Sequence, residues 1–214
     1  MTFAFRMRSL VPHIRDKLRE LAVGVSATAA IEFAMVLPVM LVVYLGSVAV
    51  GGGVTADRKL SNLSLTLANL TARATAALQT SDINGIFNAS AAGLAPFDYT
   101  QAGMVVSSIV FDSANPPNAY VVWSQATGPN ATALTASCSA NLSTTLVPNN
   151  IRTAIGSAIL SQAAFPDQPS VGYVISGTIH LSETDFMVPR NMASVPFTNS
   201  SGVTRTGCSG GNFT

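Results

Sequence analysis

An uncharged run of 18 residues, from Phe33 to Val50, is the feature that most limits how this chain folds. Extended back to Thr28 through small residues, the run spans about 33 Å as an α-helix, close to the ~30 Å hydrocarbon core of a bilayer. The residues before it carry five basic side chains: Arg6, Arg8, Arg15, Lys17 and Arg19. The run therefore predicts one membrane-spanning helix over residues 28–50, with a basic cytoplasmic leader at 1–27 and the C-terminal bulk outside.

Two details of the run affect the geometry of the helix and its possible cleavage. Pro38 lies inside it and removes a helix hydrogen bond, so a kink is expected there. The small residues Ser47 and Ala49 also form a passable signal-peptidase site, which would release an exported domain beginning at Val50. That alternative implies an unusually long basic region and an apolar region beyond the usual 7 to 15 residues.

The segment after the run predicts an amphipathic helical stalk over residues 51–80. Gly51, Gly52 and Gly53 should loosen the helix at its start, because each costs roughly 1 kcal/mol relative to alanine. Apolar residues then recur at intervals of three and four, at Leu60, Leu63, Leu67, Leu70, Ala74 and Ala77. Such a stripe packs either on its own domain alone or also against neighbouring subunits.

Residues 81–214 predict an exported α+β domain with an antiparallel sheet. The stretch 81–94 favours a short helix with Ser81 or Asp82 as its N-cap. Residues 103–113 and 119–127 are rich in valine and isoleucine and flank the turn sequence ANPPN, so they predict two strands. Further strands are expected within 171–182 and 185–197, while 151–165 fits a helix by composition or a strand by context.

Two cysteines, Cys138 and Cys208, lie in this exported part. In an oxidising compartment an even pair suggests a disulfide, which would close a loop of about 70 residues and contribute roughly 4 kcal/mol in the chain-entropy model. Two free thiols are the alternative. Zinc is not expected, because two cysteines and two distant histidines do not make a ligand set.

No catalytic constellation occurs in the sequence, which predicts that the protein is not an enzyme and takes no cofactor. A membrane-anchored hydrolase would require folding to bring His180, Glu183 and Asp185 into one pocket, although the stretch SETD at 182–185 is more typical of a turn. Trp123 is expected to be a core anchor of the sheet. A net charge of +1 does not favour nucleic-acid binding.

Glu32 stands at the start of the apolar run, where a carboxylate costs a few kcal/mol unless it finds a partner or reaches the interface. A basic leader followed by small residues, an acid, an aromatic residue and a long apolar helix resembles a type IV pilin-like signal. The stretch AAIEFAMVLP at 29–38 is similar to the tight-adherence pseudopilins of the TadE/TadG-like family. DRKLSNLSLTLANLTA, VVWSQAT and FMVPR resemble later segments of the same family.

This resemblance implies a minor pilin-like subunit that takes part in assembly of a tight-adherence (Flp) pilus. It implies a bacterial inner-membrane protein whose partners are other pilin and pseudopilin subunits, the assembly platform and a prepilin peptidase. Counting back from Glu32 puts the peptidase cut between Ala27 and Thr28, with Ala27 standing where the family usually has glycine. The new amine at Thr28 of one subunit would then pair with Glu32 of its neighbour. The rival interpretation is an exported adhesin or binding module, either released by signal peptidase or held by a simple membrane anchor.

Overall fold

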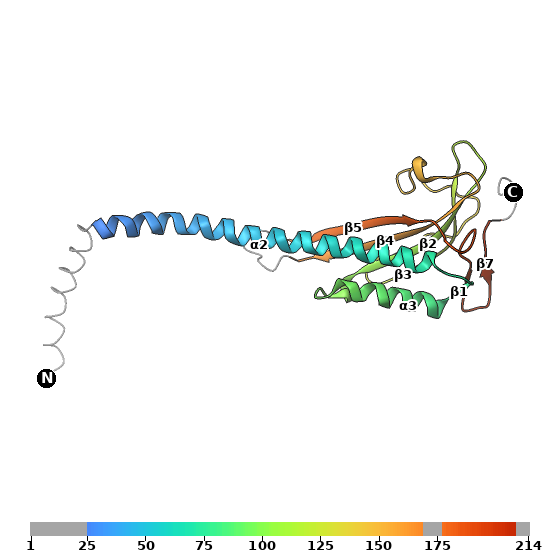
Figure 1. Ribbon diagram of the computed structural model, residues 1–214, viewed down its shortest axis with the longest axis horizontal. Helices are drawn as coiled ribbons and strands as arrows, with labels where there is room; N and C mark the ends of the chain where they lie inside the picture. Colours follow the sequence, from blue (N-terminus) through green and yellow to red (C-terminus); the bar gives the residue numbers. More distant parts are fainter. Residues whose placement is uncertain (1–24, 169–176, 209–214) are drawn as a thin grey trace, which may run out of the picture. The chain divides into compact units, whose positions relative to one another are not determined.

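The computed structural model describes residues 25–168 and 177–208 (Figure 1). The chain divides into two compact units, and their boundary on the first helix lies between Val50 and Gly51. That helix, α2, runs without a break from Val25 to Ala72 and contains Pro38. The prediction of a long apolar N-terminal helix followed by an antiparallel sheet domain is confirmed. Residues 1–24 of the predicted leader lie outside the described residues.

The first part of α2 keeps its apolar side chains on the outside. Every residue from Thr28 to Tyr44 is exposed, including Phe33 at 65%, Met35 at 73% and Val39 at 64%. Exposed side chains of this kind are costly in water because apolar area is worth about 25 cal/mol per Å² when it is removed from water. This part of the helix therefore requires an apolar environment.

The second part of α2 is amphipathic and packs on its own domain. Leu60, Leu63 and Leu67 of the apolar stripe are each at most 1% exposed, while Leu65 on the other face is 41% exposed. The helix ends at Ala72, so the last two alanines of the stripe, at 74 and 77, lie beyond it rather than in a stalk that reaches residue 80. The three glycines do not interrupt the helix, because backbone hydrogen bonding continues through them.

A short strand and a second helix follow α2. β1 is Leu78–Gln79, and α3 is Thr80–Ala91, which leads into the 3-10 turns η1 (Ala92–Leu94) and η2 (Tyr99–Gln101). The prediction of Ser81 or Asp82 as N-cap is wrong, since the N-cap of α3 is Gln79 and Asp82 is the third helical residue. The Asp82 carboxylate accepts the Gln79 N–H at 2.8 Å, which completes a capping box with glutamine in place of serine.

The main sheet has four antiparallel strands in the order β3-β2-β4-β5. β2 is Gly103–Phe111 and β3 is Ala119–Thr127, as the sequence predicts, and residues 112–118 connect them. β4 is Ser157–Asp167, which settles the ambiguous segment as a strand, after the 3-10 turn η3 (Asn149–Ile151). A small sheet joins β1 to β6 (Phe197–Thr198) and β7 (Thr204–Arg205).

The strand β5, Ile179–Met187, corrects two expectations. It is continuous from the end of the first expected range, 171–182, into the start of the second, 185–197, so these two ranges share one strand in the described residues, and residues 169–176 lie outside the described part. The stretch SETD is the middle of this strand rather than a turn, because Ser182 to Asp185 pair in register with Ala164 to Ser161 of β4. Pairing along nine residues outweighs the local preference of these polar residues for turns.

Two apolar clusters lie on the sheet. The larger contains the leucine stripe of α2, Ile83 and Phe87 of α3, and residues of β2, β3 and β4 that include Val106, Trp123 and Ile159. The smaller contains Ile109, Phe111, Val121, Val147 and Leu160, with partly buried residues of the long loop at 128–156 packed against it. Alternate residues of the central strands thus serve two cores, which explains why all nine residues of β2 are buried.

Candidate functional site

The candidate site from the sequence lies on the first turns of α2. Thr28 and Glu32 are both exposed, and because they are four residues apart they share one face of the helix. Pro38 lies six residues after Glu32, still within the helix. The backbone of Ala27 is helical as well. The helix therefore displays one carboxylate near its start, among apolar side chains such as Ile31 (59% exposed).

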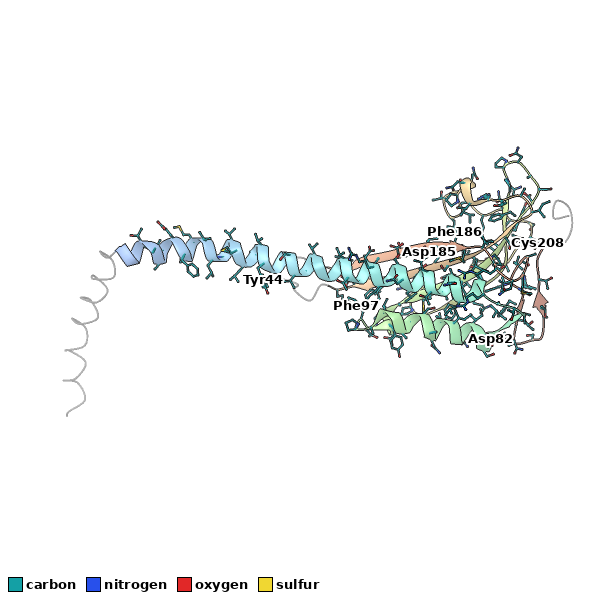
Figure 2. The ribbon with its side chains drawn as sticks, in the orientation of Figure 1. Tyr44, Asp82, Phe97, Asp185, Phe186 and Cys208 are labelled. Carbon is teal, nitrogen blue, oxygen red and sulfur yellow. A yellow bond between two sulfur atoms is a disulfide. The ribbon has the colours of Figure 1, made fainter. Side chains whose placement is uncertain are left out.

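Among the described residues, one helix is long and apolar enough to cross a membrane, and it covers Thr28–Ala72. Its apolar window has a mean hydropathy of 2.4. Tyr44 projects from the middle of this helix (Figure 2) and is 63% exposed. Length, hydropathy and exposure together make α2 suited to anchor the chain in a membrane.

Cys138 and Cys208 are bonded to each other, with their Cα atoms 5.5 Å apart. The bond joins the long loop after β3 to the segment after β7, which lie 70 residues apart in the sequence. Figure 2 marks Cys208 at the edge of the domain near this loop. The bond therefore ties the C-terminal segment to the loop side of the sheet.

Asp112 organises the turn between β2 and β3, a role that sequence reasoning missed. Its side chain is 1% exposed and accepts hydrogen bonds from the Ala114 N–H, the Asn118 N–H, the Asn118 side-chain amide and the Tyr120 hydroxyl. Burial by itself raises the pKa of Asp112, but the hydrogen bonds outweigh it and the pKa lies below its usual value. The sequence DSANPPN contains the signal, an aspartate at the first position of a turn.

Arg152 is a second buried polar residue that the sequence did not single out. It is 7% exposed and donates to the carbonyl oxygens of Val147, Pro117 and Leu142 and to Asn141 Oδ1. All four acceptors are neutral. The planar guanidinium therefore joins loop segments by hydrogen bonds and does not form an ion pair with these acceptors. Asp112 and Arg152 thus hold the connections on one end of the sheet.

The three residues considered for a hydrolase do not converge. Glu183 and Asp185 lie two positions apart on β5 and so share a face, while His180 lies on the opposite face. Burial, then the negative charges of Asp57 and Asp185, raise the pKa of Glu183. These three acids repel one another, and no group of side chains suited to hold a metal ion occurs in residues 25–168 or 177–208.

A pocket of about 390 Å³ lies between the loop after β3, the start of β2 and the interior of strands β4 and β5. Its polar lining consists of Asn130, Thr132, Gln162, Ser182, Glu183 and Thr184. Amide and hydroxyl groups of this kind bind neutral polar groups, and a single carboxylate among them does not form an acid and base pair.

Comparison with known proteins finds a family match over the first helix. Residues 27–68 match the family model described as TadE-like protein. The match begins at Ala27, includes Thr28, Glu32 and Pro38, and extends to the end of the buried leucine stripe. The resemblance drawn from AAIEFAMVLP is confirmed for this segment. Neither a curated protein nor a solved structure matches the chain.

Proposed function

We propose, from this TadE-like helix, that the protein is a minor pilin-like subunit that takes part in assembly of a tight-adherence (Flp) type IV pilus. The TadE-like family consists of pilus-associated structural proteins rather than enzymes. The observation that carries the proposal is a TadE-like match over a helix whose apolar residues 28–44 are all exposed and whose start displays Glu32. A helix of this kind supplies both an anchor and an assembly surface.

In this proposal α2 crosses the bacterial inner membrane, with the leader in the cytoplasm and the sheet domain outside. The basic leader supports that orientation, because basic flanks stay on the cytoplasmic side. A prepilin peptidase cuts between Ala27 and Thr28, and alanine is small enough to replace the usual glycine before the cut. The partners are other pilin and pseudopilin subunits and the inner-membrane assembly platform.

Cleavage would stabilise the charge of Glu32 in two ways. The mature helix would begin at Thr28, so the carboxylate would lie close to the positive end of the helix dipole. The new amine at Thr28 of an adjacent subunit would supply a counter-charge in surroundings where a lone carboxylate is costly. Glu32 therefore serves to set the register between subunits.

The mass and N-terminal sequence of the mature protein from native host membranes test this proposal. A start at Thr28 is the expected result. A start at Val50 would contradict it and favour the rival function, an exported adhesin or binding module released by signal peptidase. An intact Met1 would contradict the processing step and leave a simple membrane anchor.

A further inference from the structure

Three consecutive glycines, Gly51 to Gly53, lie in the interior of α2 without a packing reason. A Cβ atom added at Gly51 or Gly52 would meet nothing within 4 Å. At Gly53 the nearest atom would be Asp167 Oδ2 at 3.8 Å, which is an ordinary van der Waals distance. All three have helical backbone conformations that other residues adopt freely. The glycines are therefore not needed for close approach, and their effect is to weaken the helix.

The neighbouring side chains weaken the same segment further. Thr55 Oγ1 donates to the Gly51 carbonyl at 2.8 Å, and Ser47 Oγ donates to the Tyr44 carbonyl at 2.7 Å. Such bonds from serine or threonine back to the preceding turn slightly destabilise helices and often bend them. No side chain from Val50 to Thr55 is buried, and Ala49, at 7% exposed, is the buried residue of the segment 47–55, so tertiary packing holds this segment less than it holds the helix from Ala56 onward.

The position of the weak segment matches the organisation of the chain. The boundary between the two compact units lies between Val50 and Gly51. Before it, residues 28–44 are exposed and apolar, and after it the buried residues Ala56, Leu60 and Leu63 fix the helix to its own domain. The glycines thus occupy the part of α2 that neither a bilayer nor the core of the domain would hold in place.

We propose that Gly51–Gly53 form a joint at which α2 opens and bends between Ser47 and Thr55. The flanking parts of the helix keep their own environments while the direction of one relative to the other changes. Such a joint lets the exported domain reorient on a membrane-held helix at low cost. The joint goes beyond the proposed pilus role and does not depend on it.

The first test compares the full chain with a Gly51→Ala/Gly52→Ala/Gly53→Ala variant, both in lipid nanodiscs. Each glycine-to-alanine change favours the helix by a factor of about five, so backbone amide hydrogen exchange over residues 47–55 is expected to slow by about 100-fold. Gly85→Ala is the matched control, because it also fills open space in a helix, and it should leave exchange at 47–55 unchanged. Equal exchange rates in the wild-type chain and the triple variant would overturn the joint.

A second test measures bending directly and does not depend on water reaching the amides. Spin labels at Tyr44→Cys and Arg58→Cys flank the joint at exposed sites, and both native cysteines are already bonded to each other. A rigid helix would hold the labelled positions about 21 Å apart. The wild-type chain is expected to give a broad distance distribution and the triple-alanine variant a narrow one. A narrow distribution in both chains would refute the proposal.

Discussion

At the scale of single residues, two buried charges of the domain, Asp112 and Arg152, have neutral hydrogen-bond partners. Asp112 accepts four hydrogen bonds from amides and a hydroxyl, and Arg152 donates to carbonyl and amide oxygens. A buried charge without such partners would cost several kcal/mol. These two side chains therefore fix the loops around the sheet, and their removal should affect stability rather than any chemical reaction.

Asp112→Asn is expected to lower the free energy of unfolding by about 1–3 kcal/mol at pH 7. An asparagine keeps one acceptor oxygen, but its amide group would face the Asn118 side-chain amide, which is also a donor, so the bond from that amide to Oδ2 is lost. Trp123 is the only tryptophan, and its fluorescence during chemical unfolding of the detergent-solubilised chain gives the measurement.

The pH dependence of this difference follows from the lowered pKa of Asp112. Because the folded pKa lies below the unfolded value of about 3.9, the stabilisation is present above that value and is lost as pH falls through the folded pKa. The two proteins should therefore differ fully at pH 7 and progressively less below about pH 4. An undiminished difference at pH 3 would show that the charge of Asp112 is not what stabilises the turn.

Glu32→Gln should leave processing intact but reduce subunit association. The substitution keeps the size of the side chain and removes the charge that the proposed amine partner requires, so cross-linking to neighbouring subunits should fall by about tenfold or more. Glu32→Asp keeps the charge and should restore part of the signal. Normal cross-linking of the glutamine variant, with a mature start at Thr28, would show that the charge has no role in assembly.

Sequence reasoning at this scale found the residues that stand out against their surroundings. Glu32 is visible because an acid is rare at the head of an apolar run, and the cysteine pair is visible because it is the only one. Asp112 is visible only as the first residue of the turn sequence DSANPPN, and Arg152 is not visible in this way. The importance of Arg152 arises from burial and from partners up to 35 residues away, which no local pattern contains.

At the scale of elements, prediction succeeded where local preference and tertiary context agree. β2 and β3 are rich in valine and isoleucine and flank a proline-rich turn, and both form where expected. β5 contains Ser182, Glu183, Thr184 and Asp185, which favour turns, yet pairing with β4 makes them a strand. The alanine-rich β4 is likewise a strand because β2 and β5 pair on its two sides.

Trp123 joins elements that lie far apart in the sequence. Its indole N–H donates to the Val195 carbonyl at 2.7 Å, and its ring lies 5.3 Å from that of Phe197 in β6. Trp123→Phe should therefore cost about 2–4 kcal/mol through the unpaired carbonyl and the lost volume. Pulse proteolysis gives the free energy of unfolding without using tryptophan fluorescence.

The matched control for this prediction is Tyr99→Phe, an aromatic change at a side chain that is 57% exposed. Surface changes of this kind usually stay within about 0.5 kcal/mol. If Trp123→Phe were no more destabilising than Tyr99→Phe, the indole would not be holding β3 to the segment before β6.

At the scale of the whole molecule, one helix, α2, has a part suited to an apolar environment and a part that packs in the core of its own domain. Residues 28–44 are exposed and, apart from Thr28 and Glu32, apolar, whereas Leu60, Leu63 and Leu67 are buried against the sheet domain. Composition and periodicity distinguish these two parts, which is why the sequence predicts both an anchor and a domain helix. The end of α2 at Ala72 was not predictable, because apolar residues at Ala74 and Ala77 continue the helical spacing beyond the last helical turn.

Val39→Lys tests whether residues 28–50 hold the chain in a membrane. Val39 lies midway along this span and is 64% exposed, so the lysine would face lipid. A lysine at the centre of a membrane helix costs about 2.5–3.5 kcal/mol on insertion scales, which predicts a clear loss of the fraction that resists alkaline carbonate extraction. Val54→Lys is the matched control on the same helix, beyond the apolar run and 46% exposed, and it should extract like the wild-type chain. The substitution at residue 39 interrupts the apolar run on which insertion depends. Equal resistance of all three proteins to carbonate extraction would therefore mean that something other than this helix binds the membrane.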